Sequence, residues 1–403
     1  MNVFAYLKEN GLGHTLEVIY KYKLHDVLCK LILPFVKNKP LKDTIIIESH
    51  NDFDNNGGAF YEYLIANGYN KRYKIVWLLK NKRPKGKLPE NVITLGRFTP
   101  SFRKAYHVCT AKYMTADNEI TEKMRPEQRS FYLTHGAVGL KSIRSMNAYI
   151  PQSVDHILSP SARWGQVQAR EYHEPSGARF VSLGLPYNDV LYTDAPGDLH
   201  KITDKSYNKV FVWMPTFRKG GGFRRNDSEA EQPYGIPLVE TEEDLQKIQT
   251  FLEQNNCLLI IKIHPMQDPS TLEKLHGSEN IRVLTGQTVK QLGVENYRLI
   301  KDADAMISDY SSIMYSFLLL DRPMGFVLSD LKDYKLGLCV DDPEKYLSGP
   351  KIYTFEDFFT FLADVCSGKD AYTAHRRELT EWIYEHRDGN ACQRLAAFMG
   401  LEK

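Results

Sequence analysis

Short hydrophobic runs alternate with helical patterns from about residue 43 onward. The runs are continuously apolar and rich in β-branched residues, which is typical of parallel strands covered by helices on both faces. In the first half of the chain, strands are predicted at 44–49, 73–79, 91–95, 129–136 and 178–186. A helix is predicted at 57–68, where Gly68 supplies the stop signal.

A second set of strands is predicted in the other half, at 208–218, 256–265, 281–286, 303–312 and 322–330. Between the sets lies a polar stretch, 191–208, whose Pro196 and Gly197 make it the best candidate for a linker. A chain of 403 residues is also longer than one hydrophobic core usually serves. The sequence therefore predicts an α/β protein of two doubly wound, Rossmann-like domains, 43–200 and 205–403, which face each other across a cleft.

The N-terminal segment 1–42 differs in character from the rest of the chain. Its part 15–42 mixes Leu, Ile, Val and Phe with six lysines against two acidic residues. This composition suits a basic amphipathic helix lying in an anionic membrane surface, and it equally suits an ordinary packing helix with a solvated lysine face. Pro34 is expected to end or kink any long helix there. No window reaches the roughly 18 uninterrupted apolar residues of a membrane-spanning helix, so we expect a protein that is soluble or lies on a membrane.

Composition narrows the functional classes. Hydrophobic residues make up 42% of the chain and aromatic residues 12%, which describes a globular protein. Lys and Arg number 52 against 50 Asp and Glu, so no overall charge favours nucleic acid as a partner. The six cysteines form no CxxC pair and no zinc-binding spacing, and they suit a reducing cytoplasm. No P-loop, GxSxG or HExxH motif occurs.

The pattern Asp302-Ala303-Asp304 has the DxD form with which sugar-nucleotide enzymes hold a divalent metal ion. It precedes a predicted strand instead of ending one, so we interpret it as a turn. We therefore expect neither a metal site nor a cofactor.

The ends of four predicted strands carry polar residues where a doubly wound sheet presents its ligands. These ends are His135-Gly136 followed by Lys141, Met214 to Arg218, Lys262 to Pro265, and Ser308 to Ser312. In the last of them, a strand turns directly into a helix whose first turn carries Ser311 and Ser312. Backbone N–H groups and serine hydroxyls at such a place suit a phosphate, although the commonest use of serine there is to cap the helix.

Two histidines favour a site over a structural role. His135 and His264 each end an apolar run, one in each half of the chain, and each is followed by a backbone breaker. One imidazole can take a proton from a hydroxyl while the other, when charged, steadies a phosphate. Lys141, Lys262 and Arg218 can supply the positive charge that a pyrophosphate needs.

At these residues the sequence resembles the CDP-glycerol glycerophosphotransferase family, the teichoic acid primases and polymerases of bacterial cell-envelope synthesis. HGAVGLK at 135–141 is similar to the family motif HGTPLK, although it is one residue longer and lacks the proline. MPTFR, KIHP and SDYSS at 214–218, 262–265 and 308–312 are similar to the family motifs APTWR, RxHP and TDYSS. Weaker likenesses occur at 48–56, 184–189, 322–334 and 386–394, so that the resemblance spans residues 44 to 394.

The resemblance implies a two-domain GT-B architecture and a site between the domains. The donor implied is CDP-glycerol or another CDP-polyol such as CDP-ribitol, bound mainly by the C-terminal domain, with His264 at its pyrophosphate. The donor-side residues expected are Ser311, Ser312, Asp309, Lys262, Arg218, Thr216 and Pro265. His135 is the candidate base for the acceptor hydroxyl, and the acceptor-side residues expected are Gly136, Lys141, Asn55, Asn188 and Asp189.

The implied reaction is transfer at phosphorus, with release of CMP, onto a lipid-linked (undecaprenyl-type) saccharide or a polyol phosphate. Such an enzyme is expected to lie peripherally on the cytoplasmic face of the cell membrane. A GT-B nucleotide-sugar glycosyltransferase of cell-envelope polysaccharide is the alternative, and a non-catalytic nucleotide- or lipid-binding relative is a third class. Primase against polymerase, and teichoic acid against capsule, stay open.

Overall fold

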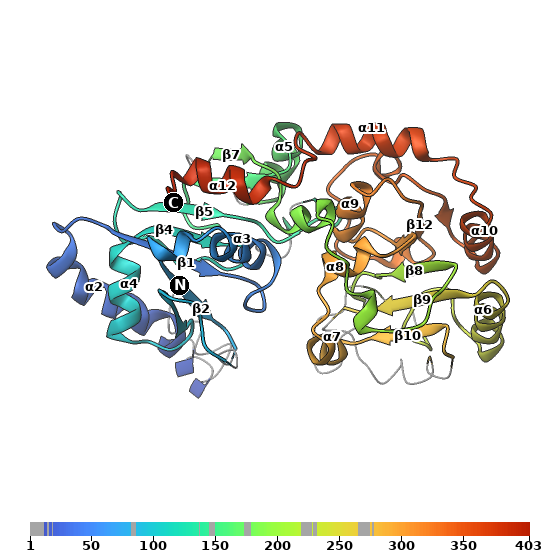
Figure 1. Cartoon of the computed structure of the whole chain (residues 1–403), viewed down its shortest axis with the longest axis horizontal. Coiled ribbons are helices and arrows are strands. Elements are labelled where there is room, and N and C mark those ends of the chain that lie inside the picture. The colour runs from blue at the N-terminus through green and yellow to red at the C-terminus, as the bar shows by residue number, and fades with distance from the viewer. Residues whose placement is uncertain are drawn as a thin grey trace.

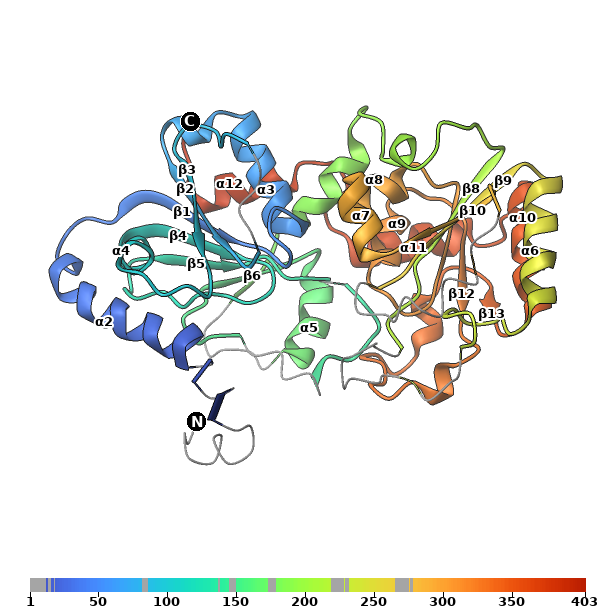
Figure 2. The ribbon, with the colours of Figure 1, turned by 90° about the horizontal axis from the view of Figure 1, so that it is seen from below.

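The computed structural model describes residues 12–13, 16–17, 19–81, 86–136, 138–144, 150–172, 179–218, 228, 232–264, 275 and 278–403. Two lobes lie side by side, each built on a sheet with helices on both of its faces (Figures 1 and 2). Helix α2 lies at the outer end of the first lobe, and α6 and α10 lie at the outer end of the second. The predicted α/β class, with two doubly wound domains of the GT-B kind, is confirmed.

The first sheet has seven parallel strands in the order β3-β2-β1-β4-β5-β6-β7. These are β1 (Lys42–Glu48), β2 (Lys74–Leu79), β3 (Val92–Gly96), β4 (Ala111–Ala116), β5 (Arg129–Tyr132), β6 (His156–Ser159) and β7 (Arg179–Ser182). The helices of this half are α2 (Leu24–Val36), α3 (Asn55–Ala66), α4 (Phe102–Thr110) and α5 (Ala162–Glu171), with short turns η1 (Ile19–Lys23), η2 (Tyr69–Lys71), η4 (Pro186–Tyr192) and η5 (Leu199–Lys201). The strand order reverses between β1 and β4, which makes the gap between their carboxyl ends the natural ligand position.

The second sheet has six parallel strands in the order β10-β9-β8-β11-β12-β13. These are β8 (Lys209–Trp213), β9 (Cys257–Lys262), β10 (Ile281–Leu284), β11 (Ala305–Ser308), β12 (Met324–Val327) and β13 (Lys351–Ile352). Its helices are α6 (Glu242–Gln254), α7 (Gly286–Leu292), α8 (Asn296–Lys301), α9 (Ile313–Leu318), α10 (Phe355–Cys366), α11 (Thr373–Ile383) and α12 (Ala391–Met399), with short turns η7 (Leu331–Asp333) and η8 (Pro343–Tyr346). Here the order reverses between β8 and β11.

All ten predicted strands and the predicted helix are confirmed, with differences at their ends. The predicted strand 129–136 ends at Tyr132, and several others stop short of the ends of their apolar runs. Apolar residues just beyond two of these strands, Leu133 and Ile263, are buried in loops. Strands β4, β6 and β13 were not predicted.

The last helix returns to the first lobe. In Figure 1, α12 lies beside β5 and far from the second sheet. Arg129 of β5 donates to the carbonyl oxygens of Met399 (2.8 Å) and Phe398 (3.2 Å), and the Phe398 ring packs edge-on against Phe131. Residues from both predicted ranges, 43–200 and 205–403, therefore build the first lobe. The predicted domain boundary itself stays a prediction.

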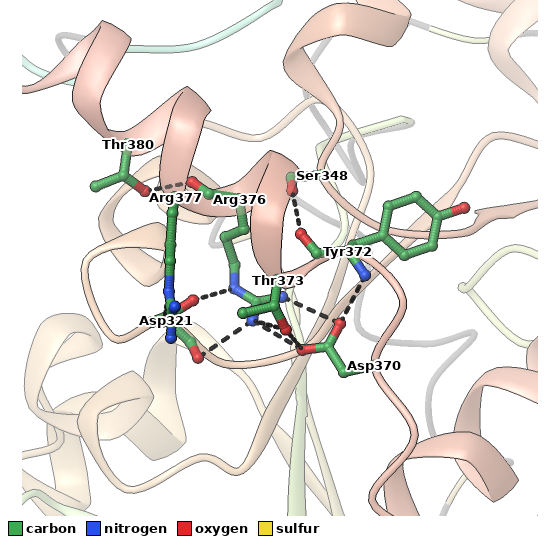
Figure 3. A network of polar contacts seen from close by, with 8 residues as sticks. All are labelled: Asp321, Ser348, Asp370, Tyr372, Thr373, Arg376, Arg377 and Thr380. Atoms are coloured by element: carbon green, nitrogen blue, oxygen red, sulfur yellow. Dashed lines mark hydrogen bonds and ion pairs between the residues drawn. The ribbon is translucent and has the colours of Figure 1, made fainter.

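Helix α11 is held to the second lobe by a buried arginine (Figure 3). Arg376, 1% exposed, donates to Asp321 Oδ1 (2.9 Å) and to Asp370 Oδ2 (2.7 Å). Asp321 sits in the turn that comes after α9, at a φ of 50°. Because α9 begins directly after Ser312, this network fixes the element that carries the predicted phosphate-binding serines.

Helix α2 packs through Cys29 and Val36 against α4 and the first sheet. Pro34 lies inside the helix, which continues for two residues beyond it and ends at Val36. Among the residues that the structure describes, no helix is both long enough and apolar enough to span a bilayer.

Candidate functional site

The carboxyl ends of β1 and β4 bring His50 and Asp117 together at the switch point of the first sheet. Asp117 is fully buried, and its Oδ2 accepts a hydrogen bond from Gly57 N at 2.9 Å. Burial raises the pKa of Asp117 well above the ordinary carboxyl value, and the backbone hydrogen bonds of Gly57 and His50 act in the opposite direction. Asp117 therefore anchors the start of α3 and the loop of His50 to the end of β4.

His135 lies just beyond β5, the next strand of the same sheet. Asn56 Nδ2 donates to the carbonyl oxygens of Leu133 (2.8 Å) and Thr134 (2.9 Å), which fixes the backbone immediately before the histidine. Thr134 has a φ of 63°, a left-handed conformation that is costly for a β-branched residue. Backbone strain of this kind is commonly held at functional sites.

The ring of His50 stacks on the ring of His135, with centroids 4.4 Å apart and planes at 22°. The His135 side chain keeps contact with solvent. The protein around it nevertheless desolvates the ring, and this effect lowers the pKa of His135 to about 3, with help from the positive charges of Lys141, His264 and Lys80 and from His50 where that ring is protonated. His135 is therefore unprotonated at neutral pH when no ligand is bound.

The second switch point is built around Asp309, directly after β11. Asp309 accepts from Thr216 N (2.8 Å) and Thr216 Oγ1 (2.6 Å), and it pairs with Arg218 Nη2 at 3.0 Å. Arg218, 2% exposed, also forms a two-point ion pair with Asp330, at 2.6 and 3.0 Å. Its guanidinium lies 4.9 Å from the ring centroid of Tyr310. These contacts hold the loops after β8, β11 and β12 to one another.

This network contains three of the predicted donor-side residues. Thr216, Arg218 and Asp309 lie together as expected, but their polar groups bond to protein. Whether any of them also contacts phosphate stays a prediction. Their observed contacts make them supports for the serine loop.

Ser311 and Ser312 are partly exposed at the start of α9. The amide of Ser311 donates to Asp309 Oδ1 at 3.0 Å, so that amide is already satisfied, and Ser311 has its hydroxyl to offer a ligand. The side chain of Ser312 makes no capping hydrogen bond to α9. The capping alternative therefore does not account for Ser312.

The loop 135–142 meets this serine directly. A Cβ on Gly136 would lie 2.8 Å from Ser312 Oγ, and one on Gly139 would lie 3.3 Å from Ser312 Cβ. Beyond Gly139, the backbone pairs with the second lobe, since Cys339 N donates to Leu140 O (2.8 Å) and Ser142 N donates to Gly337 O (3.0 Å). The first lobe's histidine loop and the second lobe's serine loop are therefore in contact.

Gly136→Ala should lower turnover, since Gly136 has a φ of 62° and an added methyl group would press on Ser312 Oγ. Strain at such a φ costs of order 1–3 kcal/mol. Gly68→Ala is the matched control, because Gly68 has a φ of 75° but its nearest neighbours are atoms of the Lys71 side chain at 3.8 Å or more. Steady-state kinetics and a thermal melt of both variants check this. Equal losses of activity in the two would contradict a role for the Gly136 contact.

His264 and Lys262 lie at the end of β9. His264 is exposed, its ring centroid is 5.5 Å from that of Phe217, and its charge contributes to the lowered pKa of His135. Desolvation lowers the pKa of Lys262 to about 8, while the carboxylate of Glu295 acts in the opposite direction. Lys262 thus remains largely cationic at neutral pH. Pro265 lies outside the described residues.

The predicted acceptor-side residues are not all gathered at this place. The backbone of Lys141 forms an isolated antiparallel β-bridge with Leu338 of the second lobe, close to the contact of Gly139 with Ser312. Asn55 is the first residue of α3 and donates to Asp54 Oδ2 at 3.1 Å. Asp189 instead accepts from Ala391 N (2.9 Å) and from the next backbone amide, at the start of α12. Its neighbour Asn188 is 5% exposed.

The DxD pattern is a turn, as interpreted. Asp302 accepts from Gly197 N (3.1 Å) and Leu199 N (2.9 Å), and Asp304 Oδ2 accepts from Val210 N (2.8 Å). Asp302 therefore ties the linker region to the second lobe, and Asp304 ties the turn to the start of β8. Within the described part of the chain, no cluster of three or more His, Cys, Asp or Glu side chains has the arrangement of a metal site.

Sequence reasoning missed three residues that shape the site. His50 belongs to the weak likeness at 48–56, but the strand order that brings it to His135 cannot be read from one sequence. Asp117 comes directly after β4, which was not predicted. Asp330 lies in the likeness at 322–334, and its pairing with Arg218 spans more than a hundred positions.

Comparisons with known proteins find relatives named for teichoic acid synthesis. The teichoic acid poly(glycerol phosphate) polymerase of Bacillus spizizenii is 24% identical over 377 residues, which cover 84% of this chain and 88% of that protein. The teichoic acid ribitol-phosphate primase of the same organism is 25% identical over 228 residues, 55% of this chain and 53% of that protein. The teichoic acid ribitol-phosphate polymerase TarK of Staphylococcus aureus is 23% identical over 333 residues, 76% of this chain and 60% of that protein. The match thus spans little more than half of two of these relatives.

A solved structure of the wall teichoic acid polymerase TagF, from a variant soaked with CDPG, shares the fold. Its TM-score is 0.70 at 19% identity, and the superposition covers 99% of this chain and 98% of that one. The family model described as CDP-Glycerol:Poly(glycerophosphate) glycerophosphotransferase matches residues 31–399. The chain therefore belongs to the CDP-glycerol:poly(glycerophosphate) glycerophosphotransferase family.

Proposed function

We propose that the protein transfers glycerol phosphate, or a related polyol phosphate, from a CDP-activated donor to a hydroxyl of a lipid-linked or glycan acceptor. CMP is released, and the product belongs to a teichoic acid or a capsule-like polymer. The observation that carries the proposal is the contact of the two switch points, with the loop of His135 seated against Ser312. Membership of the family supports the same reaction.

The residues divide into two roles. His135 takes the proton of the acceptor hydroxyl as its oxygen forms a bond to the polyol-bearing phosphorus. The bond between that phosphorus and the bridging oxygen breaks, and CMP leaves with the electron pair. His264, Lys262 and the serine hydroxyls stabilise the negative charge of the pyrophosphate.

We expect the negative charge of the bound donor to raise the pKa of His135. In the ligand-free protein, desolvation lowers the pKa of His135 to about 3, with help from the positive charges of Lys141, His264 and Lys80. A bound pyrophosphate brings negative charge to the same place, which favours the imidazolium and raises the pKa toward neutrality. His135 is thus a weak base until the donor is bound, and this order protects against proton uptake in the empty site.

A donor panel tests the proposal. Purified protein is incubated with CDP-glycerol, CDP-ribitol and UDP-sugars together with a lipid acceptor analogue, and the products are weighed by mass spectrometry. We expect CMP release with the phosphate retained in the product. Release of a nucleoside diphosphate with transfer of a sugar would instead support the glycosyltransferase alternative. Tight donor binding without turnover would support the non-catalytic alternative.

We also place the protein peripherally on the cytoplasmic face of the membrane, and α2 supports this. Exposed apolar side chains recur at spacings of three and four residues along α2 and the residues before it. This stripe is formed by Leu16, Tyr20, Leu24, Val27, Leu31 and Phe35, of which Phe35 is 76% exposed. Exposed lysines accompany the stripe at 23, 30, 37 and 39. An apolar stripe with flanking cations is typical of a helix that lies in an anionic membrane surface.

Replacing Lys30, Lys37 and Lys39 by glutamine should weaken sedimentation with anionic vesicles by roughly 100-fold at low salt, because each cation near the surface contributes about 1 kcal/mol. The loss should shrink as salt rises, since salt screens the remaining attraction. Phe35→Asp is the comparison, and its loss should persist at high salt. Binding that ignores both salt and these substitutions would argue against α2 as the contact.

A further inference from the structure

His50 occupies an unusual position beside the proposed base. Its ring and that of His135 stack at 4.4 Å and 22°, although the two residues come after different strands of the first sheet. The end of β4 lies between those strands. The stack therefore joins the loops after β1 and β5 at the edge of the sheet where ligands bind.

The stack is the contact that orients the His135 ring. A general base is normally oriented by a third group that hydrogen bonds its second ring nitrogen. In the described part of the chain, the imidazole of His135 makes no hydrogen bond. The flat contact with His50 takes the place of that third group.

His50 is itself held in one neutral form. Asn118 Nδ2 lies 2.9 Å from His50 Nδ1, and because an amide nitrogen only donates, Nδ1 carries no proton. Desolvation lowers the pKa of His50, and the charge of Lys80 acts in the same direction. The carboxylates of Asp54 and Glu119 oppose this shift without reversing it.

We propose that His50 is a positioning residue for the base, and that its ring, stacked on the His135 imidazole, fixes the plane of that imidazole. The inference rests on the proposed function, in which His135 accepts the proton of the acceptor hydroxyl. The ionisable groups that lower the pKa of His135 are His50, Lys141, His264 and Lys80. Proton uptake by the His135 ring therefore depends on the protonation of His50 and on the negative charge of the bound donor.

Two substitutions separate the stacking contact of His50 from its ability to take up a proton. His50→Phe keeps an aromatic face but cannot take up a proton, so at acid pH His135 no longer faces a second imidazolium; its pKa should rise and the acid limb of the kcat/KM profile should move to higher pH. Its kcat at neutral pH should stay close to that of the wild type. His50→Ala removes the face, so kcat should fall by ~10-fold or more through misplacement of the base, with the donor KM unchanged. His375→Phe, on α11, is the matched control and should change none of these values.

The decisive readout is an NMR titration of the His135 ring in the full-length protein with labelled histidine, which needs no activity. An unchanged His135 titration in His50→Phe, or a wild-type kcat in His50→Ala, would overturn the inference. If the wild type releases no CMP from any CDP-polyol, the proposed function fails instead, and the titration still decides whether His50 controls His135. Circular dichroism of each variant confirms that it is folded.

Discussion

Replacing His135 by alanine should lower the rate of polyol phosphate transfer by ~100-fold or more, as loss of general acid–base help does. The acceptor hydroxyl then has no group to take its proton, whereas the residues of the second lobe that we propose bind the donor are untouched. The loss should therefore appear in kcat, with donor affinity largely kept. Stopped assays of CMP release, together with calorimetric titration of the donor, measure the two quantities separately.

His264→Ala gives the informative comparison. It should lower turnover by a similar factor, and it should weaken donor binding as well, because we propose that His264 contacts the pyrophosphate. His375→Ala on α11 serves as the control for loss of a histidine. A folded His135→Ala protein with nearly full activity would remove His135 as the base.

Arg376→Met should destabilise the protein by about 3 kcal/mol, the lower end of the cost of breaking a buried ion pair by removing one partner. The substitution leaves Asp321 and Asp370 facing each other without the guanidinium that joins them in Figure 3. The lower end is appropriate because the side chains of these aspartates are 36% and 20% exposed. Urea unfolding followed by circular dichroism measures the change.

Arg377→Met is the matched control, since Arg377 pairs with the same Asp321 at 2.7 Å but its side chain is 68% exposed. Its cost should stay within about 1 kcal/mol, as is usual for surface pairs. Burial opposes ionisation of Asp370, but the hydrogen bonds from Arg376 outweigh this effect, and the pKa of Asp370 is lowered. This contribution to stability is therefore present above the ordinary carboxyl pKa and is lost as the pH falls toward the lowered value. Equal losses in the two variants would contradict the assignment of the network to Arg376.

The sheets could be predicted because their strands are continuously apolar. Runs such as TIIIES at 44–49 are buried on both faces, so hydrophobicity alone reveals them. Strand β4 was not predicted because its sequence, AKYMTA, is mixed in polarity although its residues are nearly all buried. Strands β6 and β13 have only four and two residues, too few for a periodic signal.

The motifs of the site could be predicted, but the partners of each side chain could not. The sequence placed His135 and Ser312 at strand ends in separate domains, and the structure brings their loops into contact. Arg218 was expected at the phosphate because arginine at a strand end suits one, yet it is buried against Asp330, more than a hundred positions away. Pairings of that kind depend on the order of strands in the sheet, which spacing along one sequence does not contain.

The position of α12 shows the same limit. Its amphipathic pattern is compatible with packing on either lobe, and nothing local distinguishes them. The choice is made by Asp189, which accepts from the first amides of α12, and by Arg129, which donates to the last carbonyls. Both partners are some two hundred positions or more from the helix.

A crystal structure of the folded His135→Asn protein with CDP-glycerol tests the central claim most directly. The account predicts that the pyrophosphate contacts the hydroxyls of Ser311 and Ser312 and the imidazole of His264, and that the glycerol-bearing phosphorus faces the side chain at position 135. A pyrophosphate bound on another surface, or one turned so that this phosphorus faces away from position 135, would contradict it.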